Sequence, residues 1–185
     1  MSRKYKIRNQ QGIYFVTFTI IRWIDVFIRR QYRDIMIDSL IFCQKNKGLM
    51  LYAYCIMSNH IHLIIGTSGK YKLEFIIRDI KKYTAFRIIK TIQNNPSESR
   101  REWLLKLFES AGSSNKHNTK FQFWQQHNHP IELSTNEMID QKLNYIHNNP
   151  VKAGIVTIPE NYLYSSAINY AGFPEKLLDV ILIEE

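Results

Sequence analysis

Residues 49–65 read LMLYAYCIMSNHIHLII, and this stretch decides the fold that we expect. It is rich in aliphatic and aromatic residues, which favour strands, and Ser58-Asn59 divides it at a plausible tight turn. The pattern therefore predicts a hairpin of two strands, residues 49–57 and 61–65. The apolar row of the second strand is suited to packing against helices, which would make the sheet buried and rigid.

Two histidines, His60 and His62, open the second of these strands. Because residues two apart in an extended chain point to the same side of a sheet, both imidazoles should share one face. Neutral imidazoles are good ligands for a divalent cation, and two of them leave positions open for a third ligand and for a substrate. Taken alone, the pattern also fits histidines that are simply held by hydrogen bonds.

The segments around the hairpin extend it into a layered fold. Residues 14–20 read as a first strand, and residues 31–44 and 73–92 have apolar side chains at helical spacing. Residues 121–126 are a candidate for one more strand. This order of elements predicts an α+β fold, with a ferredoxin-like antiparallel sheet and helices packed on one face.

A third helix is expected near the C-terminal end of the chain. Ser134-Thr-Asn-Glu137 matches a capping box, and Pro150 should end the helix at about Asn149, because the residue before a proline disfavours helical angles. Within this helix Tyr145 and Asn149 are four residues apart and so share one face. No internal repeat or linker interrupts the sequence, and we expect residues 1–185 to form a single domain.

The composition favours a soluble protein that binds a polyanion. A hydrophobic content of 45% in 185 residues is enough for a real core. The 25 Lys and Arg against 16 Asp and Glu give a net charge of +9, which favours nucleic acid as partner. Two cysteines in apolar surroundings fit a reducing cytoplasm, and no apolar run is long enough to span a membrane.

Basic residues concentrate at the N-terminus and in the second predicted helix, where Tyr83 and Phe86 are interleaved with them. Such a mixture can contact phosphates and stack on unpaired bases, although an ordinary solvated helix face explains it as well. The candidate DNA-binding residues are Arg3, Lys4, Lys6, Arg8, Lys81, Lys82, Tyr83 and Arg87.

Three separated blocks resemble the REP-associated tyrosine transposases, which are single-tyrosine HUH endonucleases. The blocks are MSNHIHL at 57–63, FWQQ at 123–126 and YIHNNPVKAG at 145–154. The resemblance runs from about Tyr14 to Gly172. It implies that His60 and His62 bind a metal, that Tyr145 is the nucleophile, and that Asn149 is the third metal ligand.

By this resemblance the chain is a metal-dependent enzyme that nicks single-stranded DNA and transfers the strand through a 5′-phosphotyrosine intermediate. The implied cofactor is Mg²⁺ or Mn²⁺, and the implied partner is single-stranded or hairpin DNA, with a homodimer as a possible assembly. The implied location is the bacterial cytoplasm, in association with the nucleoid. His147 or a metal-bound water is a hypothesis for the proton acceptor of the phenol.

Other interpretations remain open at this point. Tyr83 lies among lysines and is an alternative nucleophile, while His127 and His129 could instead contribute to a zinc site with several histidines. A replication or conjugation nickase would use the same chemistry. A non-catalytic nucleic-acid-binding module, derived from a transposase, would use the basic charge and leave the histidines idle.

Overall fold

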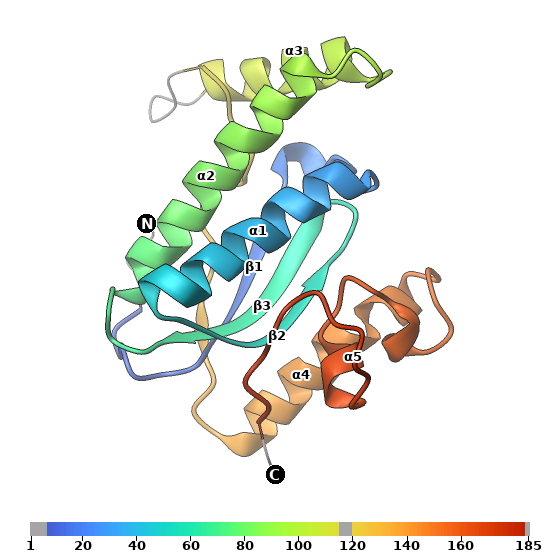
Figure 1. The fold of residues 1–185 in the computed structure, drawn as a ribbon. Helices are drawn as coiled ribbons and strands as arrows, with labels where there is room; N and C mark the ends of the chain where they lie inside the picture. Colours follow the sequence, from blue (N-terminus) through green and yellow to red (C-terminus); the bar gives the residue numbers. More distant parts are fainter. Residues whose placement is uncertain (1–6, 115–119, 184–185) are drawn as a thin grey trace.

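The computed structural model describes residues 7–114 and 120–183, and a four-stranded antiparallel sheet lies at the centre of this part of the chain (Figure 1). The spatial order of the strands is β2-β3-β1-β4, so β3 pairs with both β1 and β2. This is the α+β, ferredoxin-like arrangement that the order of elements predicted. The strands are β1 (Tyr14–Thr19), β2 (Leu49–Ile56), β3 (His60–Thr67) and β4 (Ile131–Glu132).

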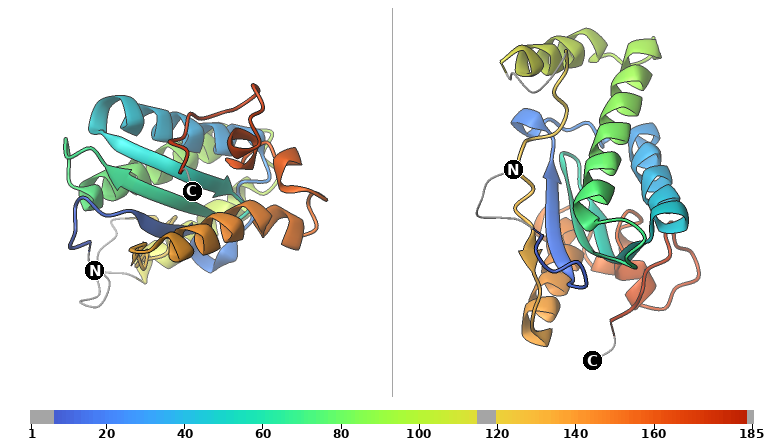
Figure 2. Two further views of the ribbon diagram at one scale, coloured as in Figure 1. Left: turned by 90° about the horizontal axis from the view of Figure 1, so that it is seen from below. Right: turned by 90° about the vertical axis from the view of Figure 1, so that its left-hand side faces the viewer.

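Helices lie on both sides of the sheet (Figure 2). The two long helices α1 and α2 cover one face, as predicted, and they also pack against each other. Helix α4 lies over the opposite face, against β2 and β3. None of the helices in residues 7–114 and 120–183 is long and apolar enough to cross a membrane. The helices are α1 (Arg30–Lys47), α2 (Leu73–Asn94), α3 (Arg101–Ser113), α4 (Asn136–Lys152) and α5 (Ala167–Tyr170), with short 3-10 turns at Ile21–Trp23 and Pro159–Asn161.

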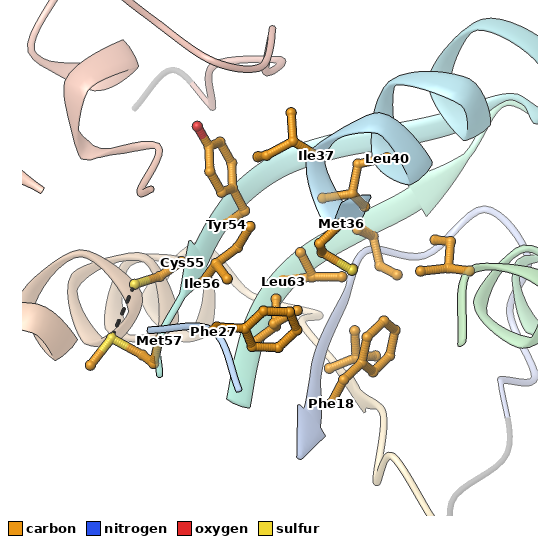
Figure 3. Packing of buried hydrophobic residues seen from close by; sticks show 14 of the residues in the cluster. Phe18, Phe27, Met36, Ile37, Leu40, Tyr54, Cys55, Ile56, Met57 and Leu63 are labelled. Carbon is orange, nitrogen blue, oxygen red and sulfur yellow. Dashed lines mark hydrogen bonds between the residues drawn. The ribbon is translucent and has the colours of Figure 1, made fainter. Parts of the chain in front are cut away.

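The main core lies between the sheet and helices α1 and α2. Leu63 of β3 is fully buried there, together with Phe18 of β1 and with Met36 and Leu40 of α1 (Figure 3). Ile65, two residues further along β3, is also fully buried. Full burial of one such side chain stabilises the fold by about 1.5–3 kcal/mol. The apolar row of β3 therefore fixes which of its faces points toward α1 and α2.

The prediction of a strand at residues 121–126 was wrong. This segment makes an isolated bridge, Trp124 with Ile20, and the fourth strand, β4, comes later in the chain. Phe123 and Trp124 are both buried, and their ring centroids are 4.8 Å apart. Because neighbouring side chains are buried together here, the segment cannot keep the alternation of a regular strand.

The ends of α4 differ from the predicted ones, and helix α3 was not predicted. The N-cap of α4 is Thr135, one residue after Ser134, and the Thr135 hydroxyl accepts a hydrogen bond from the Met138 backbone N–H at 3.2 Å. At the other end the helix passes Pro150 and reaches Lys152. Proline in the last turn removes only one backbone hydrogen bond, and its fixed φ suits a helix, so the helix continues.

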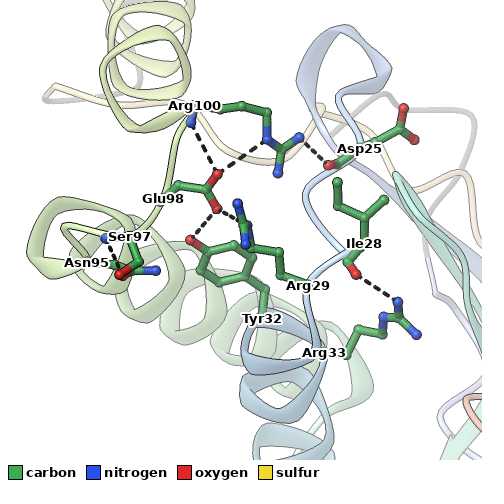
Figure 4. Close-up of polar contacts among 9 residues, drawn as sticks. All are labelled: Asp25, Ile28, Arg29, Tyr32, Arg33, Asn95, Ser97, Glu98 and Arg100. Carbon is green, nitrogen blue, oxygen red and sulfur yellow. Dashed lines mark hydrogen bonds and ion pairs between the residues drawn. The ribbon is translucent and has the colours of Figure 1, made fainter.

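A buried carboxylate joins the start of α1 to the connection between α2 and α3 (Figure 4). Glu98 is 2% exposed, and its oxygens lie 2.6 Å from Arg29 Nε, 3.3 Å from Arg100 Nε and 3.0 Å from the Tyr32 hydroxyl. Arg100 also donates to the backbone oxygen of Asp25 at 2.8 Å. Burial would raise the pKa of Glu98, but the hydrogen bonds from the Arg100 backbone, Arg29 and Tyr32 hold that pKa below its usual value.

Glu98→Gln should lower the free energy of unfolding by about 3 kcal/mol, because it leaves two partly buried guanidinium groups without their carboxylate. The folded pKa of Glu98 is depressed, so its stabilisation is complete above the pKa of an unfolded glutamate and is lost as the pH falls through the folded pKa. Urea denaturation at neutral and acidic pH measures both effects. Glu109→Gln, at the exposed pair with Lys120, is the control and should change stability by less than about 1 kcal/mol.

Candidate functional site

The pairing of β3 with β1 places both histidines on the face of the sheet that α4 covers. His62 is paired with Thr17 in the antiparallel register, and His60 opens β3 directly after the turn at Ser58 and Asn59. The centroids of the two imidazole rings are 4.7 Å apart. The prediction that the two rings share one face is therefore confirmed by the geometry.

His62 is held as a buried, neutral imidazole. It is 4% exposed, its ring stacks on Phe15 at 5.5 Å, and its Nδ1 lies 2.8 Å from the Thr17 hydroxyl. Burial, and then the charges of His60 and Lys142, lower the pKa of His62 to about 3. Its Nε2 is buried and has no hydrogen-bond partner in the described part of the chain. A proton on Nδ1, donated to Thr17, leaves the Nε2 lone pair available.

His60 is oriented by the side chain of Asn59. Its Nδ1 donates to Asn59 Oδ1 at 2.7 Å, and the Asn59 amide N–H groups donate to Asp25 at 3.0 Å and to the Trp23 backbone oxygen at 3.3 Å. These bonds fix which end of the amide faces the imidazole. Burial lowers the pKa of His60, and a hydrogen bond with the Asn149 side chain opposes that shift.

Helix α4 delivers the other two predicted residues, Tyr145 and Asn149, to the histidines. The Tyr145 ring lies edge-on to His62, with centroids 5.1 Å apart, and 6.0 Å from Phe15. One turn later Asn149 reaches His60. Tyr145 is 39% exposed, so its ring is anchored on one side and open to solvent on the other. The structure therefore brings together all four residues named for the nucleophile and the metal ligands.

Two lysines beside Tyr145 were missed by the sequence analysis. The ammonium groups of Lys142 and Lys152 lie 5.6 and 5.9 Å from the centroid of the Tyr145 ring. Their positions, three residues before and seven after the tyrosine, place them on the same helix face, and this spacing could have identified them. Positive charge here attracts a phosphate group to the phenol.

The zinc alternative is contradicted. In residues 7–114 and 120–183, no group of three or more His, Cys, Asp or Glu side chains could hold a metal ion. His127 and His129 lie before β4 with their ring centroids 6.2 Å apart, and they do not join the His60 and His62 pair. The donors at the candidate site are thus two imidazoles and the amide of Asn149.

His147 is engaged away from the phenol. Its Nε2 lies 2.9 Å from the Ser166 hydroxyl, and its ring meets Tyr170 of α5 at 5.0 Å. Burial lowers the pKa of His147 to about 4, although Glu160 opposes the shift. Since it lies two residues after Tyr145, it also points to a different side of α4. We therefore assign it no part in taking the proton of the phenol.

The predicted basic surface on α2 is present, but one of its residues has another role. An open groove of about 880 Å³ runs between α2 and residues 120–126, and Lys82 lies exposed along it. Lys81 instead donates to the Gln125 backbone oxygen at 2.8 Å and to the Asn128 side chain. Burial lowers the pKa of Lys81 to about 8. Lys81 therefore ties the loop after residue 124 to α2.

The other predicted DNA contacts are at the surface where the structure describes them. Arg8, Tyr83 and Arg87 are exposed. Tyr83 lies on α2, across the sheet from the histidines, so the geometry favours Tyr145 over Tyr83 as nucleophile. The remaining predicted contacts, Arg3, Lys4 and Lys6, lie outside the described residues.

Comparisons with known proteins identify the family of the chain and a shared fold. A family model described as "Transposase IS200 like" matches residues 13–107, a range that includes both histidines and ends before α4. The solved structure of a REP-associated tyrosine transposase bound to a REP hairpin is 16% identical, with a TM-score of 0.65 over 100% of this chain and 98% of that chain, and shows a shared fold. A candidate transposase from Deinococcus radiodurans is 18% identical, with a TM-score of 0.44 over 80% of this chain and 95% of its own. No curated protein matches the chain.

Replacing Lys81 should change how stability depends on pH. The folded pKa of Lys81 is lowered from 10.5 to about 8, so between these values the unfolded chain binds a proton that the folded chain lacks. The unfolding free energy of the native protein should therefore rise, relative to Lys81→Met, by about 1–2 kcal/mol between about pH 8 and about pH 9.5. Urea denaturation measures this difference. Lys82→Met, at the exposed neighbour, should show the same pH dependence of the unfolding free energy as the native protein. If Lys81→Met and Lys82→Met show the same pH dependence, the assignment of a lowered pKa to Lys81 is wrong.

Proposed function

Because this chain belongs to the family of IS200-like transposases, we propose that it nicks single-stranded DNA and transfers the cut strand through a covalent link to Tyr145. The observation that carries this proposal is the approach of Tyr145, from α4, to His60 and His62, from β3. A phenol can serve as the nucleophile that attacks a phosphodiester, and a pair of oriented, neutral imidazoles can hold the divalent cation that assists the attack.

The side chains present fit a divalent cation, and we propose that His60, His62 and Asn149 hold Mg²⁺ or Mn²⁺. The strongest support is the buried Nε2 of His62, which lacks a partner within the described residues. His60 has its Nδ1 engaged by Asn59, which directs its other nitrogen toward Asn149. When bound, the cation neutralises charge on a non-bridging phosphate oxygen.

Tyr145 is the proposed nucleophile. The phenol gives up its proton as its oxygen forms a bond to phosphorus, the bond from phosphorus to the 3′ oxygen breaks, and the leaving oxygen takes up one proton as the 3′-OH, so the step has no net change in protons. A 5′-phosphotyrosine link remains on the enzyme. The ring is held on one side by Phe15 and His62, so the phenol approaches the phosphate from a fixed direction. Lys142 and Lys152 supply positive charge beside the Tyr145 ring.

The phosphotyrosine link keeps the reactivity of the original phosphodiester. A later 3′-OH can attack the same phosphorus, release Tyr145 and join the strand without an external energy source. Nicking and joining are then one reaction run in both directions, as strand transfer requires.

The proposed substrate is single-stranded or hairpin DNA. The net charge of +9 and the exposed Lys82, Tyr83 and Arg87 on α2 support it, as does the REP hairpin bound by the similar solved protein. Arg8 and the preceding Arg3, Lys4 and Lys6 are further proposed phosphate contacts. Lys81 contributes indirectly, through the loop that it ties to α2.

The proposal extends to the domain organisation of the chain, its location in the cell and its assembly. Residues 1–185 would act as one nuclease domain in the bacterial cytoplasm, in association with the nucleoid, where its DNA substrate lies. A homodimer is the assembly that we propose to test first, by light scattering with and without DNA.

Tyr145→Phe should abolish covalent capture of DNA, because phenylalanine keeps the ring and its packing but lacks the attacking oxygen. The assay incubates the protein with Mn²⁺ and a labelled pool of DNA hairpins flanked by random nucleotides, and then detects adducts that survive denaturation. Tyr83→Phe is the matched control and should form the adduct normally. A chelator should prevent the adduct, and His60→Ala should keep DNA binding but lose cleavage. An adduct with Tyr145→Phe would overturn the assignment of the nucleophile.

Thr17→Val should weaken Mn²⁺ binding by about 10–100-fold, because it keeps the shape of the side chain but removes the hydrogen-bond partner that orients His62. Calorimetric titration of the DNA-free protein measures the affinity. Thr91→Val, on the outer side of α2, is the control and should bind Mn²⁺ as the native protein does. If Thr17→Val binds Mn²⁺ with the affinity of the native protein, the proposal that the Thr17 hydroxyl orients His62 as a metal ligand is wrong.

A further inference from the structure

An exposed tryptophan lies beside the histidine pair, on the turn that follows β1. Trp23 is 57% exposed, and its ring lies edge-on to His60 with the centroids 5.6 Å apart. Its neighbour Arg22 is also exposed. A large aromatic side chain gains most by burial, and an indole that is more than half exposed leaves a broad surface free for a ligand.

The backbone of this turn is strained and firmly held. Arg22 and Trp23 have φ values of 54° and 56°, in the left-handed region that residues with side chains rarely adopt. The turn is fixed by the bond from Ile21 N–H to the Phe123 oxygen at 2.8 Å and by the bond from the Asn59 amide to the Trp23 oxygen at 3.3 Å. Strain of this kind persists where the surrounding structure enforces it, and it is concentrated at functional sites.

Asn59 connects the tryptophan to the candidate metal ligand. Its amide nitrogen holds the Trp23 backbone, and its amide oxygen accepts from His60 Nδ1 at 2.7 Å. The position of the indole and the orientation of the imidazole are thus set by one side chain. A group that rests on Trp23 is therefore placed at a fixed distance from His60.

We propose that Trp23 stacks on an unpaired base next to the phosphate that is cut, and so positions that phosphate for Tyr145. This inference rests on the proposed function and assigns a residue that recognises the base part of its substrate. Single-stranded DNA offers an exposed base at every nucleotide, and an indole can stack on each of the four. Arg22 adds positive charge for the adjoining phosphate. Because an error of about 1 Å in position can slow a reaction by orders of magnitude, fixing the base contributes directly to cleavage.

The test compares two strands that differ only in their bases. One is a labelled poly-thymidine strand, and the other is an abasic strand of the same length and charge; binding is measured by fluorescence anisotropy with a chelator present, so that no cleavage occurs. The native protein should bind poly-thymidine more tightly than the abasic strand. Trp23→Ala should weaken binding of poly-thymidine by about 5- to 100-fold and leave binding of the abasic strand unchanged.

The matched control is Trp103→Ala, which removes a tryptophan of similar exposure, 53%, on α3. This control should keep the preference of the native protein for bases. Equal weakening of both strands in Trp23→Ala would overturn the proposal, because the residue would then act through the shape or charge of the turn. Unchanged binding of both strands would overturn it as well, and so would a native protein that does not distinguish the two strands.

Covalent capture separates this inference from the proposed function. If Trp23→Ala loses the preference for bases while the native protein forms no adduct through Tyr145, the stacking site stands and the nicking reaction fails. If the native protein forms the adduct and Trp23→Ala keeps both the adduct yield and the preference for bases, the nicking reaction stands and the stacking site fails.

Discussion

The arrangement of this molecule depends on the register of β3 between its two neighbours. Pairing of Thr17 with His62 directs the imidazoles to one face and Leu63 to the other. A slip of one residue would turn the buried aliphatic row toward α4 and both histidines into the apolar core. The free energy of burying several aliphatic side chains therefore also holds the histidines in place, and the site is rigid because the core is.

Helix α4 completes the site by packing on the same face of the sheet as the histidines, and this part depends on tertiary packing. The four-residue spacing of Tyr145 and Asn149 ensures that they share one helix face, but only the contact of α4 with β2 and β3 turns that face toward the histidines. Tyr145 is then held between the rings of His62 and Phe15 and the ammonium group of Lys142. Tyr145 and the paired imidazoles thus come from two neighbouring layers, the helix α4 and the sheet, that meet at one surface.

The features that could be predicted from the sequence are those with a local cause. The hairpin and the shared face of His60 and His62 follow from the two-residue period of a strand, and the long helices follow from apolar spacing. The prediction of a strand at 121–126 was wrong because the consecutive residues Phe123 and Trp124 are both buried, and this burial pattern does not follow the two-residue alternation of a strand. Lys81 was taken for a surface cation because its burial depends on a loop that is distant in sequence. Trp23 was missed because two consecutive non-glycine residues with positive φ have no sequence signature.

Positive charge around the site has two effects that support each other. Burial, His60 and Lys142 together lower the pKa of His62, so the imidazole stays neutral at physiological pH and keeps a lone pair on Nε2. The same ammonium group, 5.6 Å from the Tyr145 ring, attracts a phosphate to the phenol. An acidic side chain in its place would stabilise the protonated imidazole and repel a phosphate group. A site built from neutral nitrogen and amide donors and surrounded by lysines is thus suited to a substrate that brings its own negative charge.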